Sequence, residues 1–103
     1  MSTKKFFDVK SLEQKFGPMT VGLFLHAFRE ADGFSQVEFA KKLKLSRANL
    51  CDLEKGRKNI SPERATQIAK VLGVPETVLI QLALQDSLRS ANLNYVVELK
   101  KVS

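Results

Sequence analysis

Three side chains between positions 47 and 52 can form the hydrogen bonds by which proteins distinguish DNA bases. Arg47 can make a paired contact to guanine, and Asn49 can donate and accept together at the edge of adenine. Asp52 would repel phosphate, although it could accept from a cytosine amino group or orient Arg47, and a plain surface role fits it equally well. Without a surrounding motif all three would be ordinary exposed residues, so their interpretation depends on the elements that present them.

A helix-turn-helix, meaning two short helices with a three-residue turn between them, is predicted by residues 35–61. Ser35 can cap the first helix while Glu38 reaches back to complete a capping box. The expected apolar face of this helix consists of Val37, Phe39, Ala40 and Leu43. Ser46 is expected to cap the second helix, and Gly56 lies just past its end. The sequence thus marks where both helices begin and where the second one ends.

The second helix has an inward and an outward face. Leu50 and Leu53 turn toward the core at a spacing of one helical turn. The outward face carries Arg47, Ala48, Asn49 and Asp52. A face of this kind is what enters the major groove of DNA. We therefore expect a recognition helix, with these four side chains as candidate base contacts.

The positive charge of the chain is concentrated on this motif. Of a net charge of +6, an excess of five lies between positions 41 and 58, where seven cations stand against Asp52 and Glu54. The cations are Lys41, Lys42, Lys44, Arg47, Lys55, Arg57 and Lys58. A basic patch alone usually marks a solvated face. Its coincidence with a capped helix-turn-helix favours nucleic acid as the partner.

Together these residues resemble the phage-repressor-like helix-turn-helix family, often called the XRE family, from about position 21 to position 72. The resemblance implies an all-α, five-helix, lambda-repressor-like domain that binds double-stranded DNA. Gln36 matches a family glutamine that contacts phosphate, a role that also suits its place at a helix N-terminus. The expected contacts to the DNA backbone are Gln36, Ser46, Lys55, Arg57, Lys58 and Asn59.

The same resemblance assigns a structural role to Arg29 and Glu54, which match a pair that ties the first helix to the end of the recognition helix. The chain departs from the family at Lys44, where the turn usually has glycine, and a positive φ there would cost turn stability. It also departs at Asp52, where a neutral or basic residue is commoner. The base preference of relatives therefore cannot be transferred to this chain.

Three segments are expected along the chain: an N-terminal arm at 1–17, the DNA-binding domain with its dimerisation helix at 18–91, and a C-terminal strand and tail at 92–103. Within the tail, residues 93–99 are rich in β-branched and aromatic residues and read as a strand. A lone strand is unstable in water, so it must pair with residues 4–9, with a symmetry mate or with another protein. The expected fold is thus all-α with a short terminal β element.

Three further helices are predicted, at 19–31, from Ser61-Pro62 onward, and from about 75 to 90. The last of these is apolar around more than half of its circumference, which is more than one small core can cover. A partner subunit is expected to cover the remainder. The candidate dimerisation residues are Val78, Leu82, Leu84 and Tyr95.

Composition excludes several other classes of protein. A chain of 103 residues with 44% hydrophobic content forms one modest domain. It has no apolar run long enough for a membrane span, so a cytoplasmic, nucleoid-associated protein is expected. A single cysteine rules out a disulfide framework or a multi-cysteine metal site. Because no P-loop, dinucleotide-binding glycine turn or HExxH motif occurs, we expect neither an enzyme nor a bound cofactor or metal.

The expected function is a sequence-specific transcriptional regulator, preferably a repressor, that acts as a homodimer on a palindromic operator. A second hypothesis comes from the family resemblance, because many small members of that family are antitoxins. Such a protein would bind and neutralise a cognate toxin as well as repress its own operon. The two hypotheses are compatible.

Overall fold

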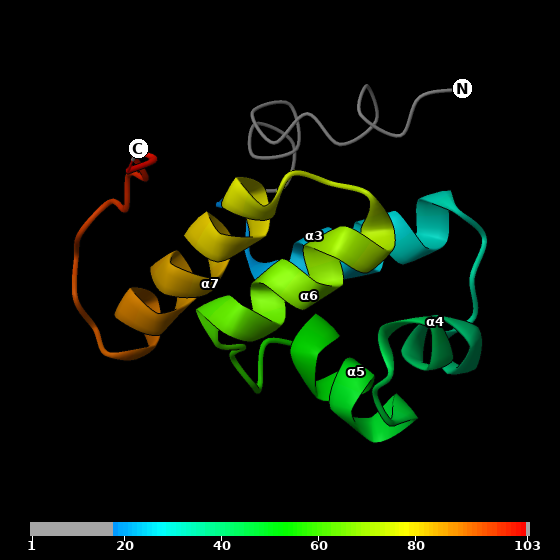
Figure 1. Ribbon diagram of the computed structural model, residues 1–103. Helices are drawn as coiled ribbons and strands as arrows, with labels where there is room; N and C mark the ends of the chain where they lie inside the picture. Colours follow the sequence, from blue (N-terminus) through cyan, green and yellow to red (C-terminus); the bar gives the residue numbers. More distant parts are fainter. Residues whose placement is uncertain (1–17, 103) are drawn as a thin grey trace. The chain divides into compact units, whose positions relative to one another are not determined.

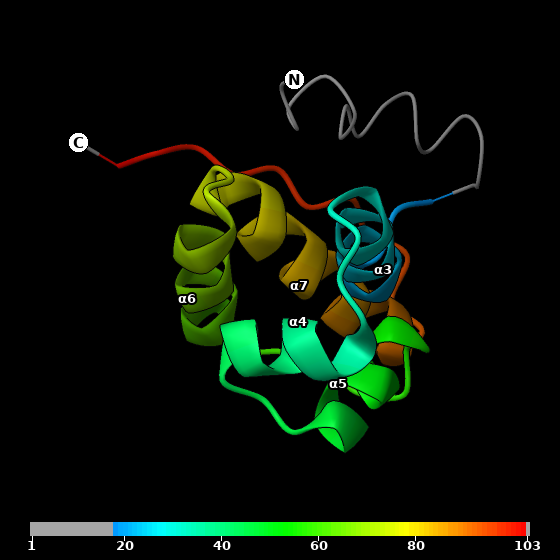
Figure 2. The same cartoon turned by 90° about the vertical axis from the view of Figure 1, so that its right-hand side faces the viewer.

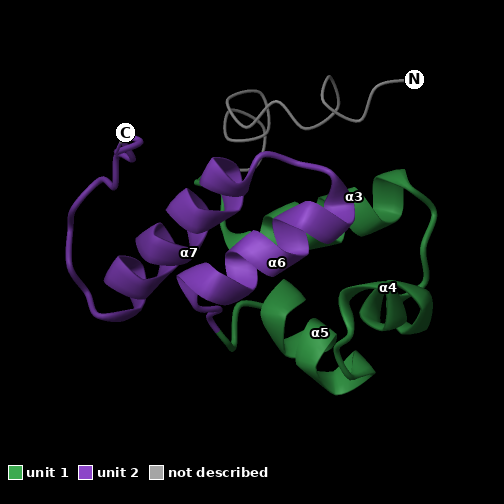
Figure 3. Cartoon of the chain, viewed as in Figure 1, with its two compact units in different colours: residues 1–58 green, residues 59–103 purple. Residues whose placement is uncertain are grey.

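The computed structural model describes residues 18–102, which contain five helices and no strand (Figure 1). The helices are α3 (Val21–Ala31), α4 (Gln36–Leu43), α5 (Arg47–Glu54), α6 (Pro62–Leu72) and α7 (Glu76–Ser90). The predicted all-α class is confirmed. The described residues belong to two compact units, one ending at Lys58 and the other beginning at Asn59 (Figure 3).

The first unit contains α3, α4 and α5, which are held together by apolar side chains. α5 packs against both α3 and α4, and two views show α4 and α5 side by side (Figures 1 and 2). The large buried side chains of this unit are Met19, Val21, Phe24, Leu25, Phe28, Phe39, Leu43, Leu50 and Leu53. Burial of each such side chain stabilises the fold by about 1.5–3 kcal/mol. The inward positions predicted for Leu50 and Leu53 are confirmed.

The predicted apolar face of α4 is wrong at one position. Val37 is 51% exposed, whereas Phe39, Ala40 and Leu43 are buried. Because an α-helix turns by about 100° per residue, Val37 lies on nearly the opposite side of α4 from Phe39. A short helix buries a narrow stripe, and residue type alone does not place a side chain on it.

Serine caps position both helices of the motif. The Ser35 hydroxyl accepts from the Glu38 backbone N–H at 3.1 Å, and the Glu38 carboxylate accepts from the Ser35 backbone N–H at 2.9 Å. The predicted capping box is therefore present, and these bonds from Ser35 lower the pKa of Glu38. At the start of α5, the Ser46 hydroxyl accepts from the Asn49 backbone N–H at 3.0 Å. Residue 47 is consequently the first of α5.

Gly22 lies where α3 meets the end of α5. A Cβ atom added to this glycine would collide with the carbonyl oxygen of Leu53 and would lie 2.8 Å from that of Glu54. The backbones of the two helices are thus in direct contact, which a residue without a side chain permits. This requirement at Gly22 could not be predicted from the sequence, because it arises from residues that are distant along the chain.

Lys44 ends α4 in the left-handed backbone region, with φ 58° and ψ 43°. The Lys44 backbone N–H donates to the Lys41 carbonyl at 3.1 Å, and the Leu45 N–H donates to the Ala40 carbonyl at 2.8 Å. This closure of the helix end needs a positive φ, at the position where the resembled family usually has glycine. The left-handed conformation costs a residue with a Cβ atom about 1–2 kcal/mol.

We expect Lys44→Gly to raise the free energy of unfolding by about 0.5–1 kcal/mol, since it removes this strain but adds freedom to the unfolded chain. Urea unfolding measures the change. Lys41→Gly is the matched control, because it removes the same charge at a helical position where glycine lowers stability by about 1 kcal/mol. Equal destabilisation by both substitutions would contradict strain at Lys44.

The second unit consists of α6, α7 and the C-terminal segment, residues 91–102. α6 begins as predicted, with the Ser61 hydroxyl accepting from the Arg64 backbone N–H at 3.1 Å and Pro62 as the first helical residue. α6 and α7 pack against each other. Their buried residues are Ala65, Ile68, Ala69, Leu72, Leu79, Leu82 and Ala83. Among residues 18–102, no helix has the length and apolar character needed to cross a membrane.

The strand predicted for residues 93–99 is not formed in this structure. α7 ends at Ser90 with Ala91 as its cap. Asn92 follows in the left-handed region with φ 58°, and the chain then continues without regular structure. A strand is defined by a ladder of bonds to another strand, whereas the backbone here bonds to glutamine side chains of α7. The proposed pairing partner at residues 4–9, like the whole arm at 1–17, lies outside the described residues.

Candidate nucleic-acid interface

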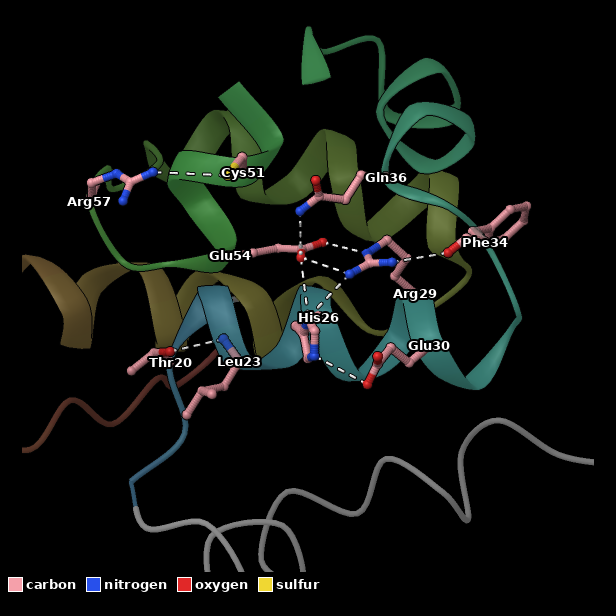
Figure 4. Close-up of polar contacts among 10 residues, drawn as sticks. All are labelled: Thr20, Leu23, His26, Arg29, Glu30, Phe34, Gln36, Cys51, Glu54 and Arg57. Carbon is pink, nitrogen blue, oxygen red and sulfur yellow. Dashed lines mark hydrogen bonds and ion pairs between the residues drawn. The ribbon is translucent and has the colours of Figure 1, made fainter. Parts of the chain in front are cut away.

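Glu54, the last residue of α5, is the centre of a polar network within the first unit (Figure 4). Arg29 from α3 donates to both of its carboxylate oxygens, with Nε 2.7 Å from Oε2 and Nη2 3.1 Å from Oε1. Only 4% of the Glu54 side chain and 14% of the Arg29 side chain are exposed. Arg29 Nη1 also donates to the carbonyl of Phe34 at 3.1 Å. The structure therefore places the two expected tie residues in a paired contact that joins α5 to α3.

Two further side chains contact the same carboxylate. Gln36 Nε2 donates to Glu54 Oε1 at 3.3 Å, and His26 Nδ1 lies 3.2 Å from that oxygen. Burial raises the pKa of Glu54, but the hydrogen bonds from Arg29, His26 and Gln36 together outweigh it and hold the pKa below its ordinary value. The Glu54 carboxylate thus connects α5 with α3 and α4.

Gln36, an expected contact to DNA phosphate, also forms a hydrogen bond within the protein. Its amide nitrogen carries two hydrogens, and one of them is directed to Glu54. The other hydrogen remains for a phosphate oxygen, so the predicted backbone contact and the observed internal bond are compatible. Sequence reasoning missed the internal bond, because the two residues lie on different helices.

Arg47 is exposed at the first position of α5. Its guanidinium group forms no hydrogen bond or ion pair with any residue of the described part, 18–102. All five of its N–H donors are therefore free for an external partner. Ala48 is also exposed, so the start of α5 presents an unobstructed surface.

Asn49 and Asp52 are half-buried and contact cations of the following loop. Lys58 Nζ donates to Asn49 Oδ1 at 2.7 Å and lies 3.8 Å from Asp52 Oδ2. Arg57 Nε donates to Asp52 Oδ1 at 3.0 Å, and this bond raises the pKa of Arg57. The structure thus brings two residues that were expected to contact DNA bases together with two that were expected to contact the DNA backbone. The sequence had indicated these roles separately.

The remaining expected backbone contacts have different surroundings. Ser46 uses its oxygen as the α5 cap and keeps its own O–H hydrogen, and Lys55 is exposed. Asn59 belongs to the second unit, where its amide nitrogen donates to Ser90 Oγ at 3.0 Å. That bond joins the start of α6 to the end of α7. Asn59 therefore has a structural contact that the sequence did not indicate.

Candidate metal ligands and the single cysteine were the remaining chemical groups of interest. Between residues 18 and 102, no group of three or more acidic, histidine or cysteine side chains could hold a metal ion. Cys51 is half-buried, and its Sγ atom lies 3.9 Å from Arg57 Nη2 (Figure 4).

A capped pair of helices whose second member presents a free arginine within a basic surface defines a DNA-binding protein. Comparison with known families agrees, since the Helix-turn-helix family model matches residues 25–79, more than half of the chain. The chain belongs to this family of helix-turn-helix DNA-binding domains and is of the phage-repressor-like type.

One curated relative is the immunity repressor protein of Bacillus phage phi105. It is 36% identical over 62 residues, which make up 60% of this chain and 43% of that protein. The chain therefore spans less than half the length of this relative. No solved structure matches the chain significantly.

Proposed function

We propose that the chain is a transcriptional repressor that binds a palindromic operator as a homodimer, with α5 in the major groove. The observation that carries this proposal is the free guanidinium group of Arg47 at the start of a helix whose other end is fixed by Glu54. A side chain that is exposed on a fixed helix can meet a base edge without reorganising the protein. The name of the phage relative, an immunity repressor, supports repression as the outcome.

A single α5 offers few base contacts, which is the physical reason for a dimer. Two copies related by a two-fold axis would present two recognition helices to major-groove segments about 34–36 Å apart. Doubling the contacts also doubles the phosphates that are neutralised, which strengthens binding at low salt. Such a protein represses by covering a promoter, and it acts in the cytoplasm beside the nucleoid.

The candidate dimerisation residues are not equally available to a second copy. Val78 and Leu84 are half-buried and Tyr95 is 68% exposed, so each offers surface to a partner. Leu82 is only 7% exposed and belongs to the buried core of the chain. A charged residue at position 82 would therefore report on folding, whereas one at position 84 reports on association.

Selection of binding sites from random duplex DNA tests the proposal. The expected result is an inverted repeat whose half-sites are centred about 10–10.5 base pairs apart, bound by two chains. Placing the selected site over a reporter promoter should lower transcription. Enrichment of a single asymmetric half-site bound by one chain would overturn the homodimer, and no enrichment would overturn sequence-specific binding.

The antitoxin alternative adds toxin binding to the same autorepression. It draws support from the exposed C-terminal segment, where Tyr95 and Val96 are 68% and 85% exposed and could meet another protein. Co-expression with the reading frame beside the gene should then yield a stable complex and relieve toxicity. Recovery of this chain without the neighbouring product would contradict the alternative.

A further inference from the structure

The C-terminal segment runs back along α7 and is held there by two glutamines (Figure 1). Gln85 Nε2 donates to the Tyr95 carbonyl at 2.6 Å, and the Val97 backbone N–H donates to Gln85 Oε1 at 2.9 Å. Gln81 Nε2 donates to the Val97 carbonyl at 3.0 Å. The backbone groups of Tyr95 and Val97 therefore face α7.

The other edge of the segment is open. In an extended chain the backbone groups of successive residues point to opposite edges, so those of Asn94, Val96 and Glu98 point away from α7. Within residues 18–102 these three residues form no hydrogen bond. An edge with unpaired N–H and C=O groups is a template for another strand.

The side chains at positions 96, 98, 100 and 102 follow a pattern: the first and last are apolar, and the two between them are charged. Val96 is 85% and Val102 is 91% exposed, and Glu98 and Lys100 lie between them. Because successive side chains of an extended chain point to opposite faces, these four side chains share one face. The two exposed valines are thus available for cross-strand contacts with a second chain.

The order of these four residues is complementary to itself. If two copies pair in antiparallel orientation about Leu99, Val96 lies opposite the partner's Val102, and Glu98 lies opposite the partner's Lys100. Each of these contacts occurs twice. Opposite charges and β-branched residues in directly opposed positions are the pairs that stabilise antiparallel strands.

Neighbouring registers lack this match. A two-fold axis at residue 98 sets Glu98 against the partner's Glu98, and one at residue 100 sets Lys100 against the partner's Lys100, both of which are repulsive. An axis at residue 97 places Glu98 opposite the partner's Val96. The charge pattern thus favours a second copy of this chain, paired in one register. A partner of different sequence would not in general carry complementary residues at these positions.

We propose that residues 96–102 of two copies pair as an antiparallel β-ribbon centred on Leu99 and so form part of the dimer interface. The proposal rests on the homodimer proposed above and names its surface and register. The glutamines of α7 hold the backbone of Tyr95 and Val97, where the ribbon begins. Pairing the outer edge converts the segment into the strand that its composition favours.

Disulfide trapping tests the register in a Cys51→Ala background, because Cys51 is the single cysteine of the chain. At the centre of the ribbon the two Leu99 Cα atoms lie about 4.5 Å apart, within the range that a disulfide spans. Leu99→Cys should therefore form covalent dimers under mild oxidation. Val97→Cys and Lys101→Cys, the matched controls, should each cross-link poorly alone but readily when mixed, since position 97 lies opposite the partner's position 101.

Charge reversal tests the pairing without new covalent bonds. Glu98→Lys or Lys100→Glu alone should raise the dimer dissociation constant about tenfold, which corresponds to about 1.4 kcal/mol. The double variant should restore wild-type association, and an equimolar mixture of the two single variants should form heterodimers. Sedimentation equilibrium measures each constant.

The outcomes separate this inference from the proposed function. A wild-type dimer in which Leu99→Cys fails to cross-link, or in which charge reversal has no effect, overturns the ribbon and leaves the homodimer intact. A wild-type chain that is monomeric both alone and on its operator overturns both.

Discussion

Replacing Arg47 by alanine is expected to weaken binding to the cognate operator by about 1–3 kcal/mol and to relax preference at one base pair per half-site. Binding to unrelated DNA should change much less. The reason is that the Arg47 guanidinium is exposed and has no hydrogen-bond or ion-pair partner within residues 18–102, so its donors serve only an external ligand. Titrations on operator and random duplexes at several salt concentrations measure both effects.

Alanine variants of Lys55 and Lys58 serve as comparisons that distinguish base contacts from phosphate contacts. Lys55→Ala should weaken both DNAs alike and lower the salt slope by about one per lost phosphate contact. Lys58→Ala should do the same and also reduce operator preference, because Lys58 Nζ holds Asn49 Oδ1 at 2.7 Å. The Lys58→Ala and Asn49→Ala changes should then be non-additive on the operator. Identical behaviour of the Arg47 and Lys55 variants would show that α5 is not the recognition helix.

Glu54→Gln is expected to lower the free energy of unfolding by about 3–5 kcal/mol, because it leaves the guanidinium of Arg29 without its buried anionic partner. This is a large share of the stability of a small domain. Glu30→Gln is the control, since Glu30 is 64% exposed and forms an ion pair with the partly exposed His26. A surface pair of this kind contributes about 0–1 kcal/mol. Urea unfolding of both variants should therefore give clearly different midpoints.

The Glu54 contribution also depends on pH in a defined direction. The pKa of Glu54 in the folded protein lies below its ordinary value of 4.5. A carboxyl group with a lowered folded-state pKa stabilises the fold fully above the unfolded-state pKa, and that stabilisation is lost as pH falls through the folded-state value. Wild type should thus lose stability on acidification below about pH 4.5, whereas Glu54→Gln should lose less. Parallel acid profiles for the two proteins would contradict a lowered pKa at Glu54.

The features that sequence predicted well are local ones. Ser35, Ser46 and Ser61 open their helices because the cap bonds join residues three positions apart, and Pro62 follows the same local rule. Such features depend on few residues and are therefore readable from the chain itself. The positive φ of Lys44 was indicated only by the family resemblance, since the resembled family usually has glycine at this position.

The features that sequence missed depend on contacts between distant residues. Nothing near Gln36 indicated that its amide would bond to Glu54, and nothing near Lys58 indicated its bond to Asn49. The strand expected at residues 93–99 reflects the same limitation, because β propensity describes a segment that fits a sheet and does not supply the neighbouring strand. The exposed position of Arg47 at the start of α5 was within reach of sequence, but the bond between Asn49 and Lys58 was not.

The direct backbone contact at Gly22 has a consequence for how this repressor-like fold can change. Side chains in a core yield when their neighbours are substituted, but two touching backbones act as a hard stop. The close approach of Gly22 to the Leu53 and Glu54 carbonyls sets the smallest possible separation of α3 and α5, so smaller apolar side chains around this contact cannot draw the two helices closer. Mutations that shrink those residues should therefore lower the thermal stability of the domain while leaving the DNA sequence preference of α5 unchanged.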